Sequence, residues 1–491
     1  EKLLESNPIG RSLLFSQARK KTLRQTRGNY PAPANIIDAV QYGYKHGYIE
    51  GLMHESKLFG ECGSSKESRA LVNLFFAMTD AKKNPLEEKV KAIRNIGVLG
   101  AGLMGSGIAD VSISKDYQVY LKDRDIQSAA KGVKSIWDDL ESKRKKRIIS
   151  SFERDQISSK ASPTGDYSAF DKVDLVIEAV FEDLELKKKI LAEAEAATPD
   201  HCIFATNTSS LPISEIAAEA KRPEQVLGMH YFSPVQKMPL LEIITTEKTA
   251  DWVTATAYDV GVKQGKTVIV VNDGPGFYTT RILAPYMNEA LLLLEDGASI
   301  KYLDDIMKDF GFPVGPMALL DEVGIDVGAH VGDTMKPLFE GRNPESRSST
   351  KAHELMEAGY LGRKNGKGLY TYDKKKKEVN LEVYNYFKGD DRQNPRKESA
   401  QLRMALMMVN EAVHCLQEGI IKSPVDGDLG ALLGLGFPPF TGGPFRYIDQ
   451  IGAEWVRHHL EEFTKELGPR FTPAPMLVDY ARSKKKFYGE G

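Results

Sequence analysis

Cysteine is scarce in this chain of 491 residues, which contains only three. Cys62, Cys202 and Cys415 are far apart and odd in number, so they support neither a disulfide framework nor a zinc motif. Their scarcity indicates a reducing compartment. Long apolar runs are absent as well. None reaches the roughly 18 residues that a membrane span requires. We therefore predict no bound metal and no transmembrane segment.

An excess of charge of one sign is also absent. Lys and Arg together number 66 and Asp and Glu together 68, which gives a net charge of −2. This balance provides no overall attraction to nucleic acid, so we predict no nucleic-acid partner. The length predicts about two to four domains. A hydrophobic content of 41% is sufficient for ordinary cores.

The chain contains stretches of different character. Residues 1–93 have apolar residues at helical spacing and gather no catalytic residue types. Between residues 94 and 274, short apolar runs alternate with helical segments, which is typical of an α/β domain with a largely parallel sheet. A charged helical insertion at about 126–159 interrupts this alternation. The predicted strands are 96–99, 119–121, 175–180, 203–205, 226–228, 240–244 and 268–271.

The remaining sequence is helical and repeats itself. Arg281 and Glu289 recur with the same spacing as Arg403 and Glu411, and a Gly-Phe-Pro segment occurs once in each copy. This pattern predicts two related helical units in tandem, each burying its apolar face against the other. We assign them to residues 275–395 and 396–491.

A glycine-rich turn follows the first predicted strand and opens a helical stretch. Gly100 permits a tight turn, Gly102 lets the backbone approach a pyrophosphate, and Gly105 lets the helix pack closely on the strand. The second strand ends at Asp123, whose carboxylate can accept hydrogen bonds from ribose hydroxyls and disfavours a 2′-phosphate. This indicates NAD rather than NADP, although Arg124 is adjacent. The predicted cofactor-binding residues here are Gly100, Gly102, Leu103, Met104, Gly105 and Asp123.

Polar residues occur near the ends of further predicted strands. Asn207 and Ser209 follow one strand, His230 follows the next, and Glu242 lies within the one after. Because ligands bind at the carboxyl ends of strands in open α/β sheets, these side chains can converge beside a nicotinamide. Oxidation of a secondary alcohol needs a base for the hydroxyl proton, which suits histidine near neutral pH, and a carboxylate can orient that base.

Each of these residues also has a structural interpretation. Ser209 precedes Pro212 and suits a helix cap, and a histidine after a strand is usually a packing residue. Glu242 is flanked by Leu241 and Ile243, so a carboxylate there needs a partner. Spacing alone leaves the catalytic and the structural interpretations open.

Five motifs, in order and at a characteristic spacing, resemble the L-3-hydroxyacyl-CoA dehydrogenase family. They are residues 100–105, 176–183, 207–211, 229–234 and 273–277. Together with the helical repeat, the similarity extends from about Ala18 to the last residue. It is strongest to the dehydrogenase part of multifunctional fatty-acid β-oxidation proteins of the mitochondrial trifunctional α-subunit type.

The resemblance implies an α/β fold, with a Rossmann-type domain at 94–274 followed by a duplicated all-α C-terminal domain. It implies NAD-dependent oxidation of L-3-hydroxyacyl-CoA to 3-ketoacyl-CoA. His230 would be the general base, Glu242 its partner, and Ser209 a contact of the substrate oxygen. Thr280 stands where the single-function enzymes carry Asn. By resemblance, Glu182, Lys187 and Asn207 join the cofactor-binding residues, and Ser209, Thr280 and Lys131 are substrate-binding residues.

The resemblance also implies partners and a location. The multifunctional relatives carry an N-terminal enoyl-CoA hydratase domain, of which residues 1–93 resemble only the last helices and the linker. We therefore expect hydratase activity only in a longer protein. A thiolase β-subunit in a multienzyme complex and a mitochondrial location are expected, whereas an association of that complex with a membrane has no signal in this sequence.

Two other functions are compatible with this fold. A dehydrogenase of free 3-hydroxy acids usually places a Lys acid/base on a helix after the sheet, which the His230 and Glu242 pair argues against. A catalytically inactive assembly scaffold would not need Ser209, His230, Glu242 and the glycine turn all intact. Turnover of acetoacetyl-CoA with NADH separates the three.

Overall fold

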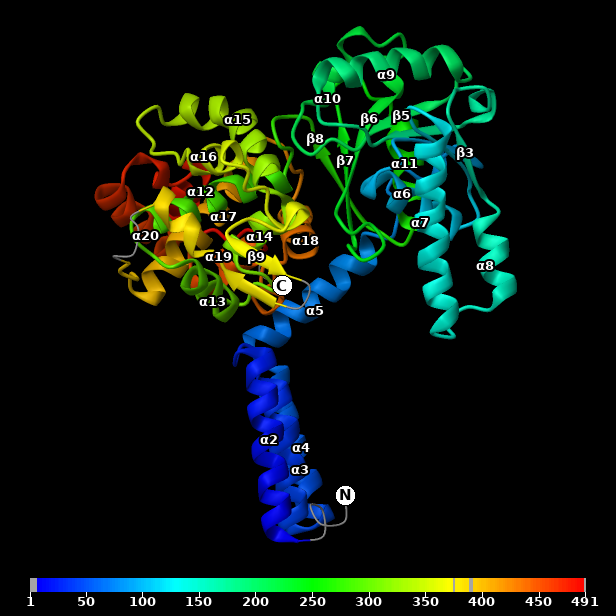
Figure 1. Cartoon of the computed structure of the whole chain (residues 1–491). Helices are drawn as coiled ribbons and strands as arrows, with labels where there is room; N and C mark the ends of the chain where they lie inside the picture. Colours follow the sequence, from blue (N-terminus) through cyan, green and yellow to red (C-terminus); the bar gives the residue numbers. More distant parts are fainter. Residues whose placement is uncertain (1–6, 374–375, 388–391, 490–491) are drawn as a thin grey trace.

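The computed structural model describes residues 7–373, 376–387 and 392–489. Figure 1 shows an elongated arm of N-terminal helices beneath two lobes, one built on a β-sheet and one helical. The arm consists of α2 (Pro8–Thr26), α3 (Pro31–His46), α4 (Tyr48–Gly63) and α5 (Lys66–Asp80). Among the described helices, none is both long and apolar enough to cross a bilayer.

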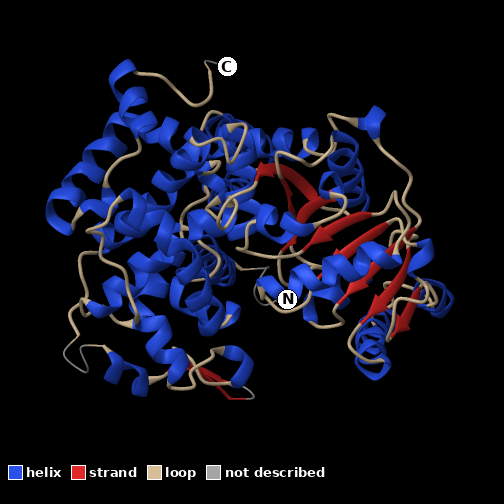
Figure 2. Ribbon diagram, turned by 90° about the horizontal axis from the view of Figure 1, so that it is seen from above, coloured by secondary structure: helices blue, strands red, loops and turns tan. Residues whose placement is uncertain are grey.

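The sheet lobe contains eight strands in the order β3-β2-β1-β4-β5-β6-β7-β8. Figure 2 shows them as one twisted sheet flanked by helices. The first six strands in this order, from β3 through β1 to β6, pair in parallel with their neighbours. β7 is antiparallel to β6, and β8 is parallel to β7. The strands are β1 (Asn95–Leu99), β2 (Gln118–Lys122), β3 (Ala161–Thr164), β4 (Leu175–Glu178), β5 (Ile203–Thr206), β6 (Val226–Tyr231), β7 (Leu240–Thr245) and β8 (Thr267–Asn272).

The helices of this lobe connect the strands. They are α6 (Leu103–Ile113), α7 (Ile126–Lys145), α8 (Ser151–Ser158), α9 (Leu184–Ala197), α10 (Ile213–Ile216) and α11 (Asp251–Lys263). The charged insertion forms α7 and α8, and Ser150 and Glu153 form a capping box that starts α8. The predicted α/β class is confirmed. The sequence patterns missed β3, because this edge strand contains Pro163 and has no apolar run.

The helical lobe is built from two successive groups of helices. The first contains α12 (Thr279–Glu295), α13 (Ile300–Phe310), α14 (Pro316–Val323), α15 (Ile325–Arg342) and α16 (Lys351–Glu357), followed by a hairpin of β9 (Tyr370–Asp373) and β10 (Lys376–Val379). The second contains α17 (Lys397–Gln417), α18 (Pro424–Leu435), α19 (Pro444–Ile451), α20 (Ala453–Leu467) and α21 (Pro475–Ser483).

The two groups share a buried polar arrangement. Asp304 accepts hydrogen bonds from the first amides of α14 and from the Tyr370 hydroxyl. Asp428 accepts them from the first amides of α19 and from the Tyr488 hydroxyl. Burial raises the pKa of both carboxyls, that of Asp428 to about 8. In each unit, therefore, a buried aspartate fixes the start of one helix, and this shared arrangement agrees with the sequence repeat.

Charged residues of the repeat pair across the boundary between the units. Arg281 of the first unit donates to Glu411 of the second at 2.7 Å, and Arg403 of the second donates to Glu289 of the first at 2.7 Å. All four side chains are buried. Separating the units would leave buried charges without partners, so these pairs fix how the two copies face each other.

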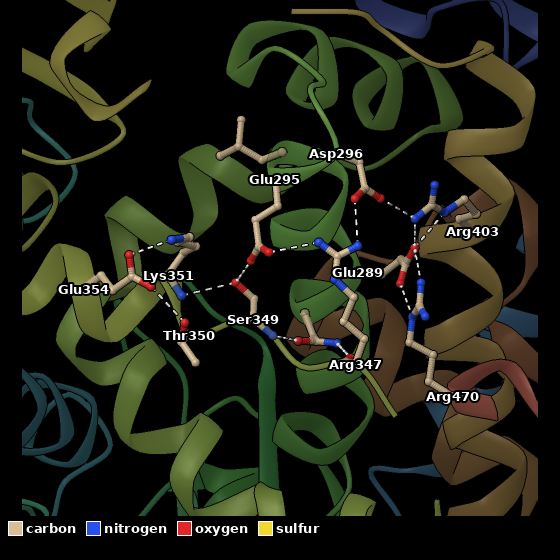
Figure 3. Close-up of polar contacts among 12 residues, drawn as sticks. Glu289, Glu295, Asp296, Arg347, Ser349, Thr350, Lys351, Glu354, Arg403 and Arg470 are labelled. Carbon is tan, nitrogen blue, oxygen red and sulfur yellow. Dashed lines mark hydrogen bonds and ion pairs between the residues drawn. The ribbon is translucent and has the colours of Figure 1, made fainter. Parts of the chain in front are cut away.

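Further residues extend this charged cluster. In Figure 3, Arg403 and Arg470 both point toward Glu289, and Asp296 lies between Arg403 and Arg347. Arg470 donates to Glu289 at 2.8 Å, and Arg347 donates to Asp296 at 2.7 Å. The cluster ties α12 and α17 to neighbouring segments of both units.

Candidate active site

The glycine-rich turn between β1 and α6 has the shape of a pyrophosphate cradle. A Cβ atom on Gly100 would lie 2.5 Å from the Ala179 carbonyl oxygen, and one on Gly105 would lie 1.8 Å from the Gly100 carbonyl oxygen. Both positions therefore require glycine for the packing of the chain itself. At Gly102 a Cβ would meet nothing within 4 Å. The open space at Gly102, at the N-terminus of α6, fits the close approach of a dinucleotide phosphate.

Asp123 lies directly at this turn. One carboxylate oxygen accepts a hydrogen bond from the Ala101 amide at 2.7 Å, and the other accepts from the Arg124 amide at 2.7 Å. Each oxygen keeps a lone pair that can accept from a ribose hydroxyl. The Arg124 side chain is 85% exposed and pairs with Asp125, so it does not occupy this carboxylate.

Apolar side chains are exposed at the same edge of the sheet. Leu103 at the start of α6 is 76% exposed, and Phe181, which follows β4, is 87% exposed. Met104 is half-buried. Because β1 and β4 are neighbours and parallel, these side chains flank one edge of the sheet, the edge at which dinucleotides bind in such folds. The sequence patterns did not single out Phe181.

Lys187, which was predicted by resemblance to bind the cofactor, is completely buried. It donates to Glu178 at 2.9 and 3.1 Å and lies 3.3 Å from a Glu182 oxygen. Burial acts to raise the pKa of Glu182, but Lys187 and hydrogen bonds from Thr208 and Ser209 together lower it below its usual range. The structure therefore leaves Lys187 no surface for a direct contact with a ligand, and its neighbour Glu182 is partly exposed.

The loop after β5 is held in place by its own polar groups. The Asn207 side-chain oxygen accepts from the Tyr231 amide at 2.8 Å, which links this loop to the end of β6. The Ser209 amide donates to Glu182 at 3.0 Å. The Ser209 hydroxyl makes no hydrogen bond to any described residue, so it remains available to a ligand.

His230 and Glu242 are directly opposite each other on neighbouring strands. The antiparallel register of β6 and β7 pairs these two residues, and their side chains meet with His230 Nδ1 2.7 Å from Glu242 Oε2. Glu242 is fully buried and His230 almost so. A carboxylate can only accept, so Nδ1 carries the proton and Nε2 is left as the basic nitrogen. Glu242 lies within β7, as predicted, whereas His230 lies within β6 rather than after it.

Thr279 of the helical lobe hydrogen-bonds to Glu242, and no sequence pattern indicated this residue. Its amide and its hydroxyl both donate to the Glu242 carboxylate. Thr280, the neighbouring residue that was selected, is half-buried and makes no side-chain hydrogen bond within the described part of the chain. Lys131 is exposed on α7. Thr279 is the first residue of α12, two positions after Phe277, and this place is the signal by which sequence could have identified it.

Comparison with known proteins agrees with this geometry. Residues 95–274 match the 3-hydroxyacyl-CoA dehydrogenase NAD binding domain, and residues 276–372 and 401–489 each match the C-terminal domain of the same family. The chain is 45% identical over 490 residues to the fatty acid oxidation complex subunit alpha of Vibrio parahaemolyticus, and 46% identical over 494 residues to that of Shewanella loihica. Each alignment covers 99% of this chain and 69% of the relative.

Solved structures give the same assignment. The 3-hydroxybutyryl-CoA dehydrogenase of Escherichia coli matches with a TM-score of 0.69 and 26% identity, covering 80% of this chain and 99% of that one. The dehydrogenase part of multifunctional enzyme 1 from C. elegans matches with a TM-score of 0.55 and 25% identity, covering 83% and 98%.

The comparisons also correct one expectation. The predicted mitochondrial location is wrong, because these highly similar relatives are bacterial. That location was predicted only from the resemblance to the trifunctional type, and not from any residue of the chain. The predicted NAD cofactor, the dehydrogenase class and the role in β-oxidation are confirmed. The chain belongs to the 3-hydroxyacyl-CoA dehydrogenase family, with one NAD-binding domain and two copies of the C-terminal domain.

Proposed function

We propose that this chain oxidises L-3-hydroxyacyl-CoA to 3-ketoacyl-CoA with His230 as the general base. The observation that carries the proposal is the buried His230–Glu242 pair, joined at 2.7 Å in the same sheet as the glycine turn. Burying a carboxylate costs free energy that its partners must offset, and a buried titratable pair of this kind is typical of functional sites.

Each residue has a separate part in this reaction. Bound NAD, held by the glycine turn and Asp123, would supply the hydride acceptor for the substrate carbon that carries the hydroxyl group. Nε2 of His230 takes the hydroxyl proton, and Glu242 stabilises the imidazolium that results. The free Ser209 hydroxyl donates to the reacting oxygen. Asn207 and Glu182 fix the loop that presents Ser209.

The wider assignments are also proposals. We assign residues 94–274 to cofactor binding, with 275–395 and 396–491 as the two helical units, and we assign Lys131 and Thr280 to the acyl-CoA substrate. The relatives are subunits of a fatty acid oxidation complex, so we expect this chain to work with a partner subunit. A thiolase is the partner class that fits, because thiolysis consumes the 3-ketoacyl-CoA product.

Reduction of acetoacetyl-CoA by NADH, followed at the nicotinamide absorbance, tests the function. We expect turnover with acetoacetyl-CoA, none with free acetoacetate, and a large loss in His230→Ala. Turnover of free acetoacetate alone would indicate a hydroxy-acid dehydrogenase. No turnover of either compound, in protein that still binds NADH, would indicate a scaffold.

A further inference from the structure

We infer that the Thr279 hydroxyl is a positioning group that sets the basicity of His230 by sharing the charge of Glu242. The inference rests on the proposed function of His230 and Glu242. It adds that the catalytic pair of the sheet lobe is completed by the first residue of the helical lobe.

The contacts of Glu242 carry the inference. Oε1 of Glu242 accepts from the Thr279 amide at 3.0 Å, and Oε2 accepts from the Thr279 hydroxyl at 2.6 Å. Oε2 is also the oxygen that His230 Nδ1 contacts at 2.7 Å. Thr279 is fully buried, so water does not compete for these bonds. One carboxylate oxygen is therefore shared between the base and a hydroxyl group from α12.

The chain reaches this position through an unusual turn. Gly276 and Phe277 both have positive φ values, 68° and 51°. This region is strained for phenylalanine, and the strain is retained where the surroundings require it. The turn places Thr279 at the N-terminus of α12, where the helix dipole favours a negative charge. The Phe277 ring also lies 6.1 Å from the His230 ring.

The charge of Glu242 is held differently from that of the other buried glutamate of the sheet. Glu178 has the ammonium group of Lys187 within 3 Å. Among the described residues, Glu242 forms no ion pair with Lys or Arg, and its one pairing of this kind is with His230. Thr279 and the start of α12 therefore provide the remaining stabilisation of this carboxylate.

The effect on His230 follows from the shared oxygen. A hydroxyl that donates to Oε2 draws electron density away from the bond to Nδ1 and weakens the stabilisation of the imidazolium. The hydrogen-bonding and ring contacts of His230 among the described residues are Glu242 from β7 and the rings of Phe232 and Phe277. Glu242 is thus the charge that His230 contacts directly, and Thr279 modulates it.

The test is the pH profile of kcat/KM for oxidation of 3-hydroxybutyryl-CoA by the full chain. Thr279→Val removes the hydroxyl but keeps the amide donor, the shape and the helix start. We expect its acidic limb to move to higher pH by roughly half a unit to one unit, because the proton is held more tightly on His230. Thr279→Ser retains the hydroxyl and should restore the wild-type limb.

Thr256→Val is the matched control. Thr256 is also fully buried, and its hydroxyl donates within α11, to the Trp252 carbonyl. Its loss should leave the acidic limb in place. Thr279→Ala is the second variant if Thr279→Val does not fold, and it carries the same expectation.

The outcomes separate this inference from the proposed function. An unmoved limb in the folded Thr279→Val or Thr279→Ala protein overturns the inference. A limb at lower pH also overturns it, because the hydroxyl would then strengthen, and not weaken, the stabilisation of the imidazolium by Glu242. The proposed function fails separately, if wild-type protein has no activity or if His230→Ala keeps both its turnover and the acidic limb.

Discussion

Replacing Glu242 with glutamine tests the catalytic pair more sharply than deleting either side chain, because glutamine has the same shape. The carboxylate accepts three hydrogen bonds, from His230 Nδ1, the Thr279 hydroxyl and the Thr279 amide. Glutamine can accept on one side only. If its NH2 group faces the Thr279 amide, two donors oppose each other. If it faces His230, the ring must turn to the tautomer with a proton on Nε2, which is then no longer a base.

Both arrangements lower turnover, and the magnitude follows from related chemistry. General-base catalysis contributes about 10²–10⁴-fold, which corresponds to roughly 3–5 kcal/mol of transition-state stabilisation. A histidine held in the wrong tautomer loses about 10⁴-fold in the serine protease triad. We therefore expect kcat of Glu242→Gln to fall by about 10²–10⁴-fold, His230→Ala to fall similarly, and NAD affinity to stay nearly unchanged.

The double variant decides whether the two residues act as one unit. Once His230 is absent, Glu242 has no base to orient, so His230→Ala with Glu242→Gln should be little worse than His230→Ala alone. Turnover by absorbance and NADH binding by fluorescence, each over a pH series, provide the data. In Glu242→Gln the acidic limb should move to lower pH, because the imidazolium loses its counter-charge. Multiplicative losses in the double variant would refute the pair and leave Glu242 as a buried structural acid.

Three further predictions concern the cofactor site and the helical lobe. Wild-type protein should prefer NAD to NADP, and Asp123→Ala should raise KM for NAD and erode that preference; equal use of both cofactors by the wild type would contradict the ribose assignment. Glu289→Ala leaves two buried arginines, Arg403 and Arg470, without their shared carboxylate, so denaturant unfolding should show a loss of about 3–5 kcal/mol. The exposed pair of Lys134 and Asp138 is the control, for which Asp138→Ala should cost about 1 kcal/mol or less. Because the two helical units pair within one chain, we expect the protein to be active without dimerising through residues 276–491. Sedimentation that finds activity only in such a dimer would contradict this expectation.

The parts of the site that could be predicted from sequence depend on local chain geometry. The turn at Gly100, Gly102 and Gly105 is set by a strand, a few residues and a helix that are consecutive, so its form follows from the order of residues. Asp123 follows from the same unit. The pairing of His230 with Glu242 does not, because it depends on the antiparallel register of β6 and β7. Spacing left that pairing open, and family resemblance supplied it.

The features that were missed depend on contacts between distant segments. β3 has no apolar run and is recognisable only by its pairing with β2. Thr279 and Thr280 are equivalent in local sequence, and the choice between them depends on how the turn at Phe277 aims the first residue of α12. Lys187 was predicted by resemblance to bind the cofactor, but its side chain is buried against Glu178, a contact between β4 and α9 that no local sequence pattern indicates. The location was wrong for a different reason, because it came from a relative and not from the chain.

The contact between Thr279 and Glu242 connects the fold to the chemistry. His230 and Glu242 belong to the sheet, which also carries the glycine turn, but their charge balance is completed by a residue of α12. That helix in turn carries Arg281 and Glu289, whose partners lie in the second helical unit. The boundary between the units and the catalytic pair are therefore connected through a single helix, α12. The duplicated lobe would then contribute to catalysis by holding α12 in place, in addition to any contact that it makes with the substrate.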